Sequence, residues 1–528
     1  MLAEFRPGRL IEPMSGRSVS GREIVELSTR RSACYADLGL RRFDRVFLHH
    51  GNSIEFFADL LAVWHLGACA IPIDPRLTPF EVETLAAAAK PRLSIRCDIT
   101  EAPATSATLP GARVLSTGEA GERARRFSVT MAPACGASLD DDALILFTSG
   151  TTGEPKGVVH THRSLRSRWS SLDASLGLDA FSRTLCVLPT HFGHGLICNC
   201  LFPWLSGRDL YVAPPFTLPI LSRLGAMVDE FEITFMSSVP TVWRLALKVA
   251  APPRTATLER VCCGSAPLSA ALWNSVRAWT GASDVLNAYG ITETGSWLAG
   301  TTPPNVTPED GLVGVAWGGE LKILESGSTR TSPAAAKACA HRQSGHVWIK
   351  TPALMRGYLD RDDLTQRAVR DGWFSTGDIG YMDERGALYL EGREREEINK
   401  GGTKIHPGDV DNVVERFDGV LDVCTFGCDD VLHGQNVAIA VVLNACDDET
   451  LCRLRAWTQR HLAAHQFPQR WYVVPSLPRS ARGKVSRDAV ARLCAPLEPV
   501  DLRTHVAGAA DDVAARRFSR VQPDVPRS

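Results

Sequence analysis

The chain has 528 residues, of which 44% are hydrophobic and 22% charged. This is the composition of a globular protein, and the length predicts more than one domain. The 58 basic and 59 acidic side chains give a formal net charge of −1, which excludes a global attraction to nucleic acid or to an anionic membrane.

The first residues lack the apolar core of a signal peptide, and no stretch reaches the roughly 18 apolar residues of a spanning helix. We therefore expect a cytoplasmic protein without a membrane span. The 15 cysteines are an odd number for a disulfide framework, and Cys424, Cys428 and His433 provide only three candidate zinc ligands. Reduced, mostly buried thiols are the simpler interpretation.

The first third of the chain alternates helix and strand signals. Apolar residues at helical spacing predict a helix from Ile54 to about Trp64, and residues 68–73 have the apolar pattern of a short buried strand. Thr78, Pro79 and Glu81 form a capping-box signature that begins a second, alanine-rich helix. This alternation predicts an α/β fold with a mostly parallel sheet.

The most strand-like run, residues 143–147, leads directly into a polar loop over residues 148–157. That loop contains four hydroxyl side chains, three glycines and Lys156, a composition that suits a polyphosphate. The spacing excludes a P-loop, because Lys156 follows Pro155 and precedes Gly157. An ordinary solvated turn remains the alternative at this point.

From about residue 311 to residue 358 the pattern changes to short strands separated by glycines, which predicts a small β subdomain. Within it, Ser326–Gln343 has the composition of an exposed loop. The charged run 391–397 indicates a domain boundary, and a further αβ unit follows it. From about Asp501 the chain has little periodicity and is expected to be a disordered tail.

Six segments, in order along the chain, resemble the motifs of the adenylate-forming enzymes. This family includes acyl- and aryl-CoA ligases, peptide-synthetase adenylation domains and luciferases. The matching segments are Leu144–His162, Cys263–Leu268, Asn287–Glu293, Ser375–Asp378, Gly392–Arg393 and Pro478–Lys484. One such motif would be weak, whereas six in the right order are specific.

The resemblance implies that a carboxylate attacks ATP to give acyl-AMP and pyrophosphate, followed by capture on a thiol. It implies that Thr292 contacts the α-phosphate, that Glu293 binds Mg²⁺, and that Asp378 accepts the ribose hydroxyls with Arg393 beside it. The other implied ATP contacts are Thr148, Ser149, Gly150, Thr151, Thr152, Gly153, Lys156, Gly264, Ser265, Ala266, Pro267, Asn287, Ala288, Tyr289 and Gly290.

The resemblance also assigns adenylation itself to Lys484, on a small C-terminal domain that must move so that a thiol can enter. Without the motif, Lys484 would be interpreted as a surface lysine. Arg395 stands at the family's hinge, where most members have Asp or Lys. Gly401 and Gly402 would line the thiol tunnel, or form a hairpin turn.

The acid-binding pocket is less well defined. The segment Leu188–Leu196 contains no acidic residue, so a buried ammonium would have no partner and a free α-amino acid is disfavoured as substrate. Either histidine of this segment could instead be structural, and His346 stands where the family commonly has Glu. The candidate wall residues are His191, Phe192, His194, Val239 and Trp243, with Gly264 and Tyr289.

The sequence therefore predicts a large N-terminal domain, residues 1–392, of mostly parallel α/β subdomains plus a small β-barrel-like subdomain. A small mobile α+β domain, residues 393–500, and a tail, 501–528, follow.

The leading hypothesis is an acyl- or aryl-CoA ligase that uses ATP, Mg²⁺ and a small carboxylic acid. One alternative is that the protein loads the acid onto a separate carrier protein's phosphopantetheine, and another is that it forms an amide. A third is a catalytically silent nucleotide-binding protein, and the intact Lys156, Glu293, Asp378 and Lys484 argue against this third alternative. The sequence does not indicate whether the protein is a monomer or an oligomer.

Overall fold

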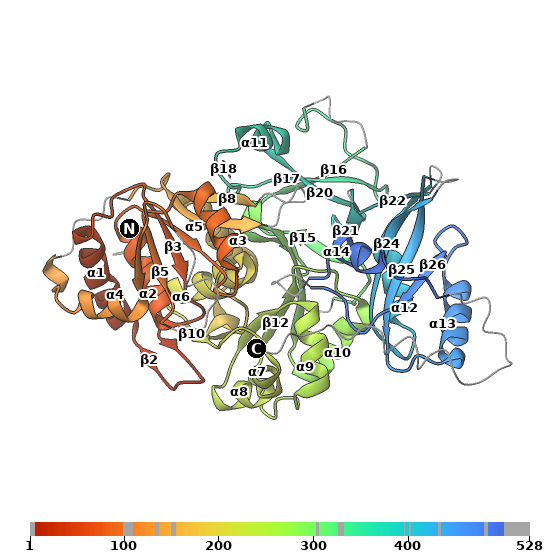
Figure 1. Cartoon of the computed structure of the whole chain (residues 1–528), viewed down its shortest axis with the longest axis horizontal. Helices are drawn as coiled ribbons and strands as arrows, with labels where there is room; N and C mark the ends of the chain where they lie inside the picture. The colour runs from red at the N-terminus through yellow and green to blue at the C-terminus, as the bar shows by residue number, and fades with distance from the viewer. Residues whose placement is uncertain are drawn as a thin grey trace. The chain divides into compact units, whose positions relative to one another are not determined.

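The computed structural model describes residues 6–98, 109–131, 137–148, 155–302, 306–325, 332–394, 396–400, 403–430, 434–479 and 484–500. The chain divides into two compact units, Met1–Glu394 with Ala481–Lys484, and Arg395–Ser480 with Val485–Ser528 (Figure 1). Within the described residues, no helix has both the length and the apolar character that crossing a membrane requires. The cysteines in these ranges are all free, and most are buried.

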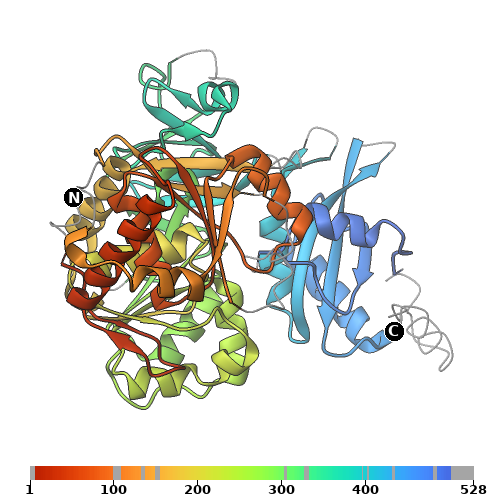
Figure 2. The same cartoon turned by 60° about the vertical axis from the view of Figure 1, so that its left-hand side comes forward.

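The first unit contains a seven-stranded sheet, most of whose strands come from the N-terminal part of the chain and are coloured red to orange in Figure 2. Its strand order is β18-β8-β7-β4-β3-β5-β6, and the pairs among β3 to β6 and between β4 and β7 are parallel. Pairs β7/β8 and β8/β18 are antiparallel. The strands are β3 (Arg45–His49), β4 (Cys69–Pro72), β5 (Leu93–Arg96), β6 (Arg113–Ser116), β7 (Asp142–Thr148), β8 (Lys156–Thr161) and β18 (Gly357–Tyr358).

Helices cover both faces of this sheet, which explains why β3, β4 and β5 are buried along almost their whole length rather than at alternate residues. Phe47 and Ile71 pack in one core cluster with residues of α3, whereas their neighbours Val46 and Ala70 belong to the cluster that contains α1 and α2. The predicted capping box of Thr78 and Glu81 begins α3. The helices are α1 (Gly21–Asp37), α2 (Ile54–His65), α3 (Pro79–Ala89), α4 (Thr117–Ala124) and α5 (His162–Leu176).

A second, fourteen-stranded sheet of the same unit follows the path β16-β17-β20-β21-β15-β14-β13-β12-β11-β9-β10-β1-β2, with β19 paired to β20. Strands from β1 to β13 along this path pair in parallel, and those from β13 to β16 pair antiparallel. The short strands after residue 311 are thus hydrogen-bonded to the parallel strands through β14 and β15, a connection that the sequence pattern did not predict.

The strands of this sheet are β1 (Leu10–Ile11), β2 (Ser18–Val19), β9 (Arg183–Cys186), β10 (Asp209–Val212), β11 (Phe235–Ser238), β12 (Arg260–Gly264), β13 (Asp284–Ile291), β14 (Ser296–Gly300), β15 (Leu312–Ala316), β16 (Glu320–Leu324), β17 (Gly345–Lys350), β19 (Val369–Arg370), β20 (Trp373–Met382) and β21 (Leu388–Arg393). The remaining helices of the unit are η3 (Val129–Met131), η4 (Asp179–Phe181), the π-helix η5 (His194–Leu201), α6 (Phe202–Leu205), α7 (Leu218–Ser222), α8 (Leu224–Glu230), α9 (Pro240–Val249), α10 (Ala270–Thr280), η6 (Thr292–Thr294) and α11 (Asp362–Ala368).

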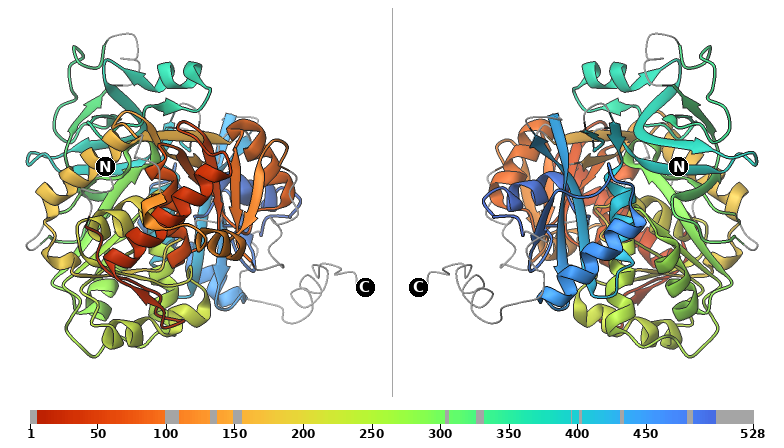
Figure 3. Two further views of the ribbon diagram at one scale, coloured as in Figure 1. Left: turned by 90° about the vertical axis from the view of Figure 1, so that its left-hand side faces the viewer. Right: turned by 90° about the vertical axis from the view of Figure 1, so that its right-hand side faces the viewer.

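The second unit is a five-stranded sheet with helices on both faces, shown in blue in Figure 3. Alternate residues of its central strand face two separate cores: Ile439 packs with α12 and α13, and Ala440 packs with α14. The elements are β22 (Ile398–Lys400), β23 (Thr403–Ile405), α12 (Pro407–Glu415), β24 (Val420–Asp430), β25 (Gly434–Leu443), α13 (Asp448–His461), β26 (Arg470–Val473) and α14 (Arg487–Cys494).

Candidate active site

The two ends of the predicted phosphate loop lie side by side at one end of the first sheet. Thr148 ends β7 and Lys156 begins β8, and the two residues are direct partners in the antiparallel ladder. The Thr148 hydroxyl donates a hydrogen bond to the carbonyl of Lys156 at 3.5 Å. Five of the predicted loop residues lie outside the described ranges: Ser149, Gly150, Thr151, Thr152 and Gly153.

Tyr358 connects this lysine to the predicted magnesium ligand, Glu293. The Lys156 ammonium nitrogen lies 5.6 Å from the centroid of the Tyr358 ring, within the range of a cation–π contact. The Tyr358 hydroxyl donates to Glu293 Oε1 at 2.7 Å. No sequence signal singled out Tyr358, because its two contacts lie far from it along the chain.

The short turn that carries Thr292 and Glu293 is held by its backbone carbonyls. His160 Nε2 lies 2.8 Å from the carbonyl oxygen of Thr292. The backbone amide of Met355 donates to the carbonyl oxygen of Glu293 at 2.7 Å. Arg168 donates to the carbonyl of Thr294 through Nε at 3.1 Å and Nη2 at 3.0 Å, and the Cys198 thiol donates to that of Gly295 at 3.4 Å.

Four successive carbonyls therefore each have a hydrogen-bond partner, so little freedom remains in the backbone beneath Glu293. Burial lowers the pKa of His160 to about 4, so its ring is neutral at pH 7 and Nε2 carries the proton that it donates. Arg168 is fully buried, and burial lowers its pKa to about 10, which leaves the guanidinium charged. Neither residue was predicted from the sequence.

These residues fit a magnesium ion that is shared with ATP. A hard cation requires oxygen donors, and Mg²⁺ is commonly held by one or two carboxylates together with phosphate oxygens. Glu293 supplies one carboxylate, with one oxygen engaged by Tyr358. Among the described residues, no group of three or more His, Cys, Asp or Glu side chains could hold a metal ion. The phosphates of ATP would therefore have to supply the further oxygen ligands.

The predicted ribose aspartate, Asp378, lies buried on β20 with two protein partners. Arg393 Nε donates to Oδ1 at 2.9 Å, and the Tyr289 hydroxyl donates to Oδ2. Burial and the neighbouring carboxylate raise the pKa of Tyr289 well above its usual value, so its hydroxyl keeps the proton. A carboxylate has about four acceptor positions, so Asp378 retains capacity for ribose hydroxyls.

The predicted adenine-side segments lie together at the carboxyl ends of β12 and β13, where parallel sheets commonly bind ligands. Gly264 pairs with Ala288, and a Cβ at residue 264 would lie 2.3 Å from the Ala288 carbonyl oxygen. Ser265 has a φ of 69°, in the left-handed region. Asn287 donates through its side chain to the carbonyl of Leu312 at 2.7 Å.

His194 is held in a chain of hydroxyl groups. Its Nε2 lies 2.6 Å from Ser237 Oγ and its Nδ1 lies 2.9 Å from Ser265 Oγ, while Ser237 donates to the carbonyl of Cys262 at 3.1 Å. Because Ser237 uses its proton on Cys262, His194 donates from Nε2 and accepts from Ser265 at Nδ1. Burial lowers the pKa of His194 to about 3, in keeping with a neutral ring. Both nitrogens are thus engaged, which favours the structural alternative for this residue.

The other candidate wall residues are mostly buried, at the ends of neighbouring elements. His191 Nε2 lies 3.4 Å from Asp74 Oδ2. Trp297 was not predicted; it is fully buried, and its ring packs edge-on against His194 with centroids 5.3 Å apart. The candidates Phe192, Val239 and Trp243 are buried as well.

In the second unit, Arg479 and Arg487, which flank Lys484 in the sequence, are both held by other residues of that unit. Arg479 pairs with Val485 in an isolated antiparallel bridge and also contacts Asp422. Arg487 donates to Asp411 at 2.7 Å and to the carbonyl of Thr425 at 2.6 Å. Lys484 itself is exposed.

Of the remaining predicted residues, Arg395, Gly401 and Gly402 lie outside the described ranges. Lys400 and Thr403, which flank the two glycines, are paired in an antiparallel ladder. His346, which departs from the family pattern, has its Nδ1 3.7 Å from Glu394 Oε2.

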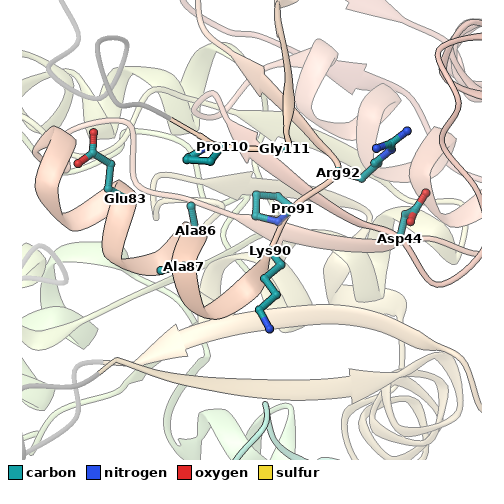
Figure 4. A pocket seen from close by; sticks show the side chains of 9 residues that line it. All are labelled: Asp44, Glu83, Ala86, Ala87, Lys90, Pro91, Arg92, Pro110 and Gly111. Carbon is teal, nitrogen blue, oxygen red and sulfur yellow. The ribbon is translucent and has the colours of Figure 1, made fainter.

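A surface hollow of about 560 Å³ lies beside the C-terminal end of α3 (Figure 4). It is lined by Asp44, Glu83, Ala86, Ala87, Lys90, Pro91, Arg92, Pro110 and Gly111. None of these residues belongs to the six motifs, so we assign the hollow no part in the site.

Comparison with known proteins agrees with this arrangement. The model of the AMP-binding enzyme family matches residues 4–359, and that of the AMP-binding enzyme C-terminal domain matches residues 409–484. The oxalate–CoA ligase of Arabidopsis thaliana is 31% identical over 493 residues, which cover 89% of this chain and 92% of that protein. The 2-succinylbenzoate–CoA ligase of Geobacillus kaustophilus is 28% identical, with coverage of 93% and 96%.

Among solved structures, ATP-bound MatB from Rhodopseudomonas palustris superposes with a TM-score of 0.80 at 26% identity, over 92% of this chain and 96% of that one. The predicted fold class and the predicted resemblance to adenylate-forming enzymes are both confirmed. The chain therefore belongs to the family of AMP-binding enzymes.

Proposed function

We propose that the protein activates a carboxylic acid with ATP, forming acyl-AMP and pyrophosphate, and then transfers the acyl group to the thiol of coenzyme A. The observation that carries the proposal is the cluster of Lys156, Tyr358 and Glu293, which brings a cation and a carboxylate suited to a metal ion to the end of one polar loop. Asp378, buried and held by two partners, supports nucleotide binding in the same unit.

In the first step, a carboxylate oxygen of the acid bonds to the α-phosphorus, and the bond from that phosphorus to the bridging oxygen breaks to release pyrophosphate. Both reactants are anions, so the protein's contribution is to position them and to stabilise the charge that moves. Lys156 would hold the leaving phosphates, and Thr292 would contact the α-phosphate. Lys484 would contact the oxygens of the attacking carboxylate and of the α-phosphate. Mg²⁺, when bound at Glu293, would supply further positive charge there.

In the second step, the thiolate sulfur of coenzyme A attacks the acyl carbon, and AMP leaves with the electron pair of the broken carbon–oxygen bond. Relatives named as CoA ligases for oxalate, long-chain fatty acids, 2-succinylbenzoate and 4-chlorobenzoate support coenzyme A as the acceptor. The lack of an acidic residue in segment 188–196 argues against acids that carry an ammonium group.

The test is ATP–pyrophosphate exchange with aromatic, short, medium and long acids, run beside Lys484→Ala. We expect exchange with one class of acid, and a loss of about 10² or more in the variant, the scale of one transition-state donor. Mass spectrometry after addition of coenzyme A or a pantetheinylated carrier protein then identifies the acceptor. A thioester on the carrier alone would contradict the choice of coenzyme A, and absence of exchange with every acid would contradict acid activation.

A further inference from the structure

Tyr358 lies between the two charged residues of the phosphate site and contacts each with a different part of its side chain. The face of the ring lies 5.6 Å from the Lys156 ammonium, and the hydroxyl donates to the Glu293 carboxylate at 2.7 Å. Removal of one contact therefore need not disturb the other.

The backbone around Tyr358 is fixed on both sides. Strand β18 pairs with β8, the strand that begins with Lys156, with Tyr358 opposite Val158. The Tyr358 amide donates to the Thr365 hydroxyl at 2.9 Å. Three residues earlier, the Met355 amide donates to the carbonyl of Glu293, so one short segment joins the lysine strand to the glutamate turn.

The hydroxyl bond has a defined consequence for the carboxylate. When a glutamate side chain is held in place, the number of rotamers open to it falls on the order of twofold to tenfold. Because Tyr358 already holds Glu293 in the folded protein, this entropy cost is met on folding and not when the metal binds. Donation to Oε1 leaves Oε2 as the oxygen available to a hard cation.

We propose that Tyr358 is a positioning residue, which fixes Glu293 for the magnesium ion of Mg·ATP while its ring keeps Lys156 beside the phosphates. The proposal rests on the proposed function for the identity of the nucleotide and the metal. It assigns a task to a residue outside the six motifs from which the site was predicted.

Tyr358→Phe is the sharpest test, because it deletes the hydroxyl and keeps the ring. The measurement is binding of Mn²⁺, as a paramagnetic stand-in for Mg²⁺, to the protein with ATP and no acid. We expect about tenfold weaker Mn²⁺ binding, the scale of one hydrogen bond to a charged group, with ATP affinity in EDTA unchanged. Tyr358→Leu, which removes the ring as well, should also weaken ATP binding in EDTA.

Tyr389→Phe is a matched control, because Tyr389 donates a comparable hydrogen bond to Glu309 at 3.1 Å elsewhere in the unit. We expect wild-type Mn²⁺ binding from it, and thermal melting of all variants confirms that they are folded. Equal Mn²⁺ affinity in Tyr358→Phe and wild type would overturn the proposal, as would equal losses in Tyr358→Phe and Tyr389→Phe.

The two proposals fail in different ways. Wild type that binds Mn²⁺ and ATP but exchanges pyrophosphate with no acid would contradict the proposed function and leave the Tyr358 comparison measurable. Wild type that exchanges pyrophosphate, with Tyr358→Phe binding Mn²⁺ normally, contradicts the role of Tyr358 alone. Wild type that binds no Mn²⁺ in the presence of ATP overturns both.

Discussion

Replacing Arg168 with methionine would remove the guanidinium that holds the turn beneath Glu293. The side chain is fully buried and donates three hydrogen bonds to main-chain carbonyls, two to Thr294 and one to Trp317 at 2.8 Å. Methionine is unbranched and apolar, so it can occupy much of the same space without supplying a donor.

Two opposing terms set the change in stability. Two buried carbonyls lose their donors, at about 1–3 kcal/mol each, a total of about 2–6 kcal/mol. Against this, burial lowers the pKa of Arg168 to about 10 from an ordinary value near 12.5, which corresponds to about 3 kcal/mol of unfavourable free energy for the buried charge. The variant should therefore lie between about 1 kcal/mol more stable and about 3 kcal/mol less stable than wild type.

The effect on adenylation should be much larger. A displacement of about 1 Å in a positioned group can cost about 10² in rate, and Thr294 would lose its anchor one residue after Glu293. We expect pyrophosphate exchange, per folded molecule, to fall by about that factor, with unfolding measured in parallel by urea titration. Arg260→Met, which removes a guanidinium–carbonyl bond to Leu176 elsewhere, is the matched control. Unchanged exchange in Arg168→Met, or an equal loss in Arg260→Met, would refute the reasoning.

Three further predictions concern the nucleotide and pH. Asp378→Asn removes the negative charge beside Arg393 and replaces one acceptor oxygen with an amide donor, so it should raise the KM for ATP at least about tenfold, which initial rates at varied ATP would show. Gly264→Ala places a Cβ 2.3 Å from a carbonyl oxygen, so equilibrium dialysis should find weaker ATP binding than in Gly51→Ala, where no neighbour lies within 4 Å. Burial lowers the pKa of His160 to about 4, so the unfolded state binds the extra proton between about pH 6.5 and 4, and stability falls as the pH drops through that window. His160→Gln should flatten this fall in calorimetric melting, and an unaltered slope would contradict it.

Features that depend on neighbours in sequence could be predicted. The capping box that begins α3 joins residues three apart, and the apolar run that became β7 was evident from composition. The site motifs could be identified for the same reason, because each is a contiguous stretch of a known family.

The supporting contacts could not be predicted, because they join distant parts of the chain. Arg168 and Thr294 are 126 residues apart, and Tyr358 and Glu293 are 65 apart. Nothing local distinguishes Arg168 from a solvent-exposed arginine of a helix; only the packing of α5 against the turn after β13 makes it an internal donor. The π-helix that begins at His194 was likewise not predicted, since its apolar residues also suit an α-helix or a buried strand.

The turn that carries Glu293 is the tip of a hairpin between β13 and β14, the point at which the large sheet changes from parallel to antiparallel pairing. Strands on one side of this seam end at the candidate acid wall, and strands on the other lead to Asp378. A change in the twist between the two halves of the sheet would therefore act at this hairpin, which carries Thr292 and Glu293.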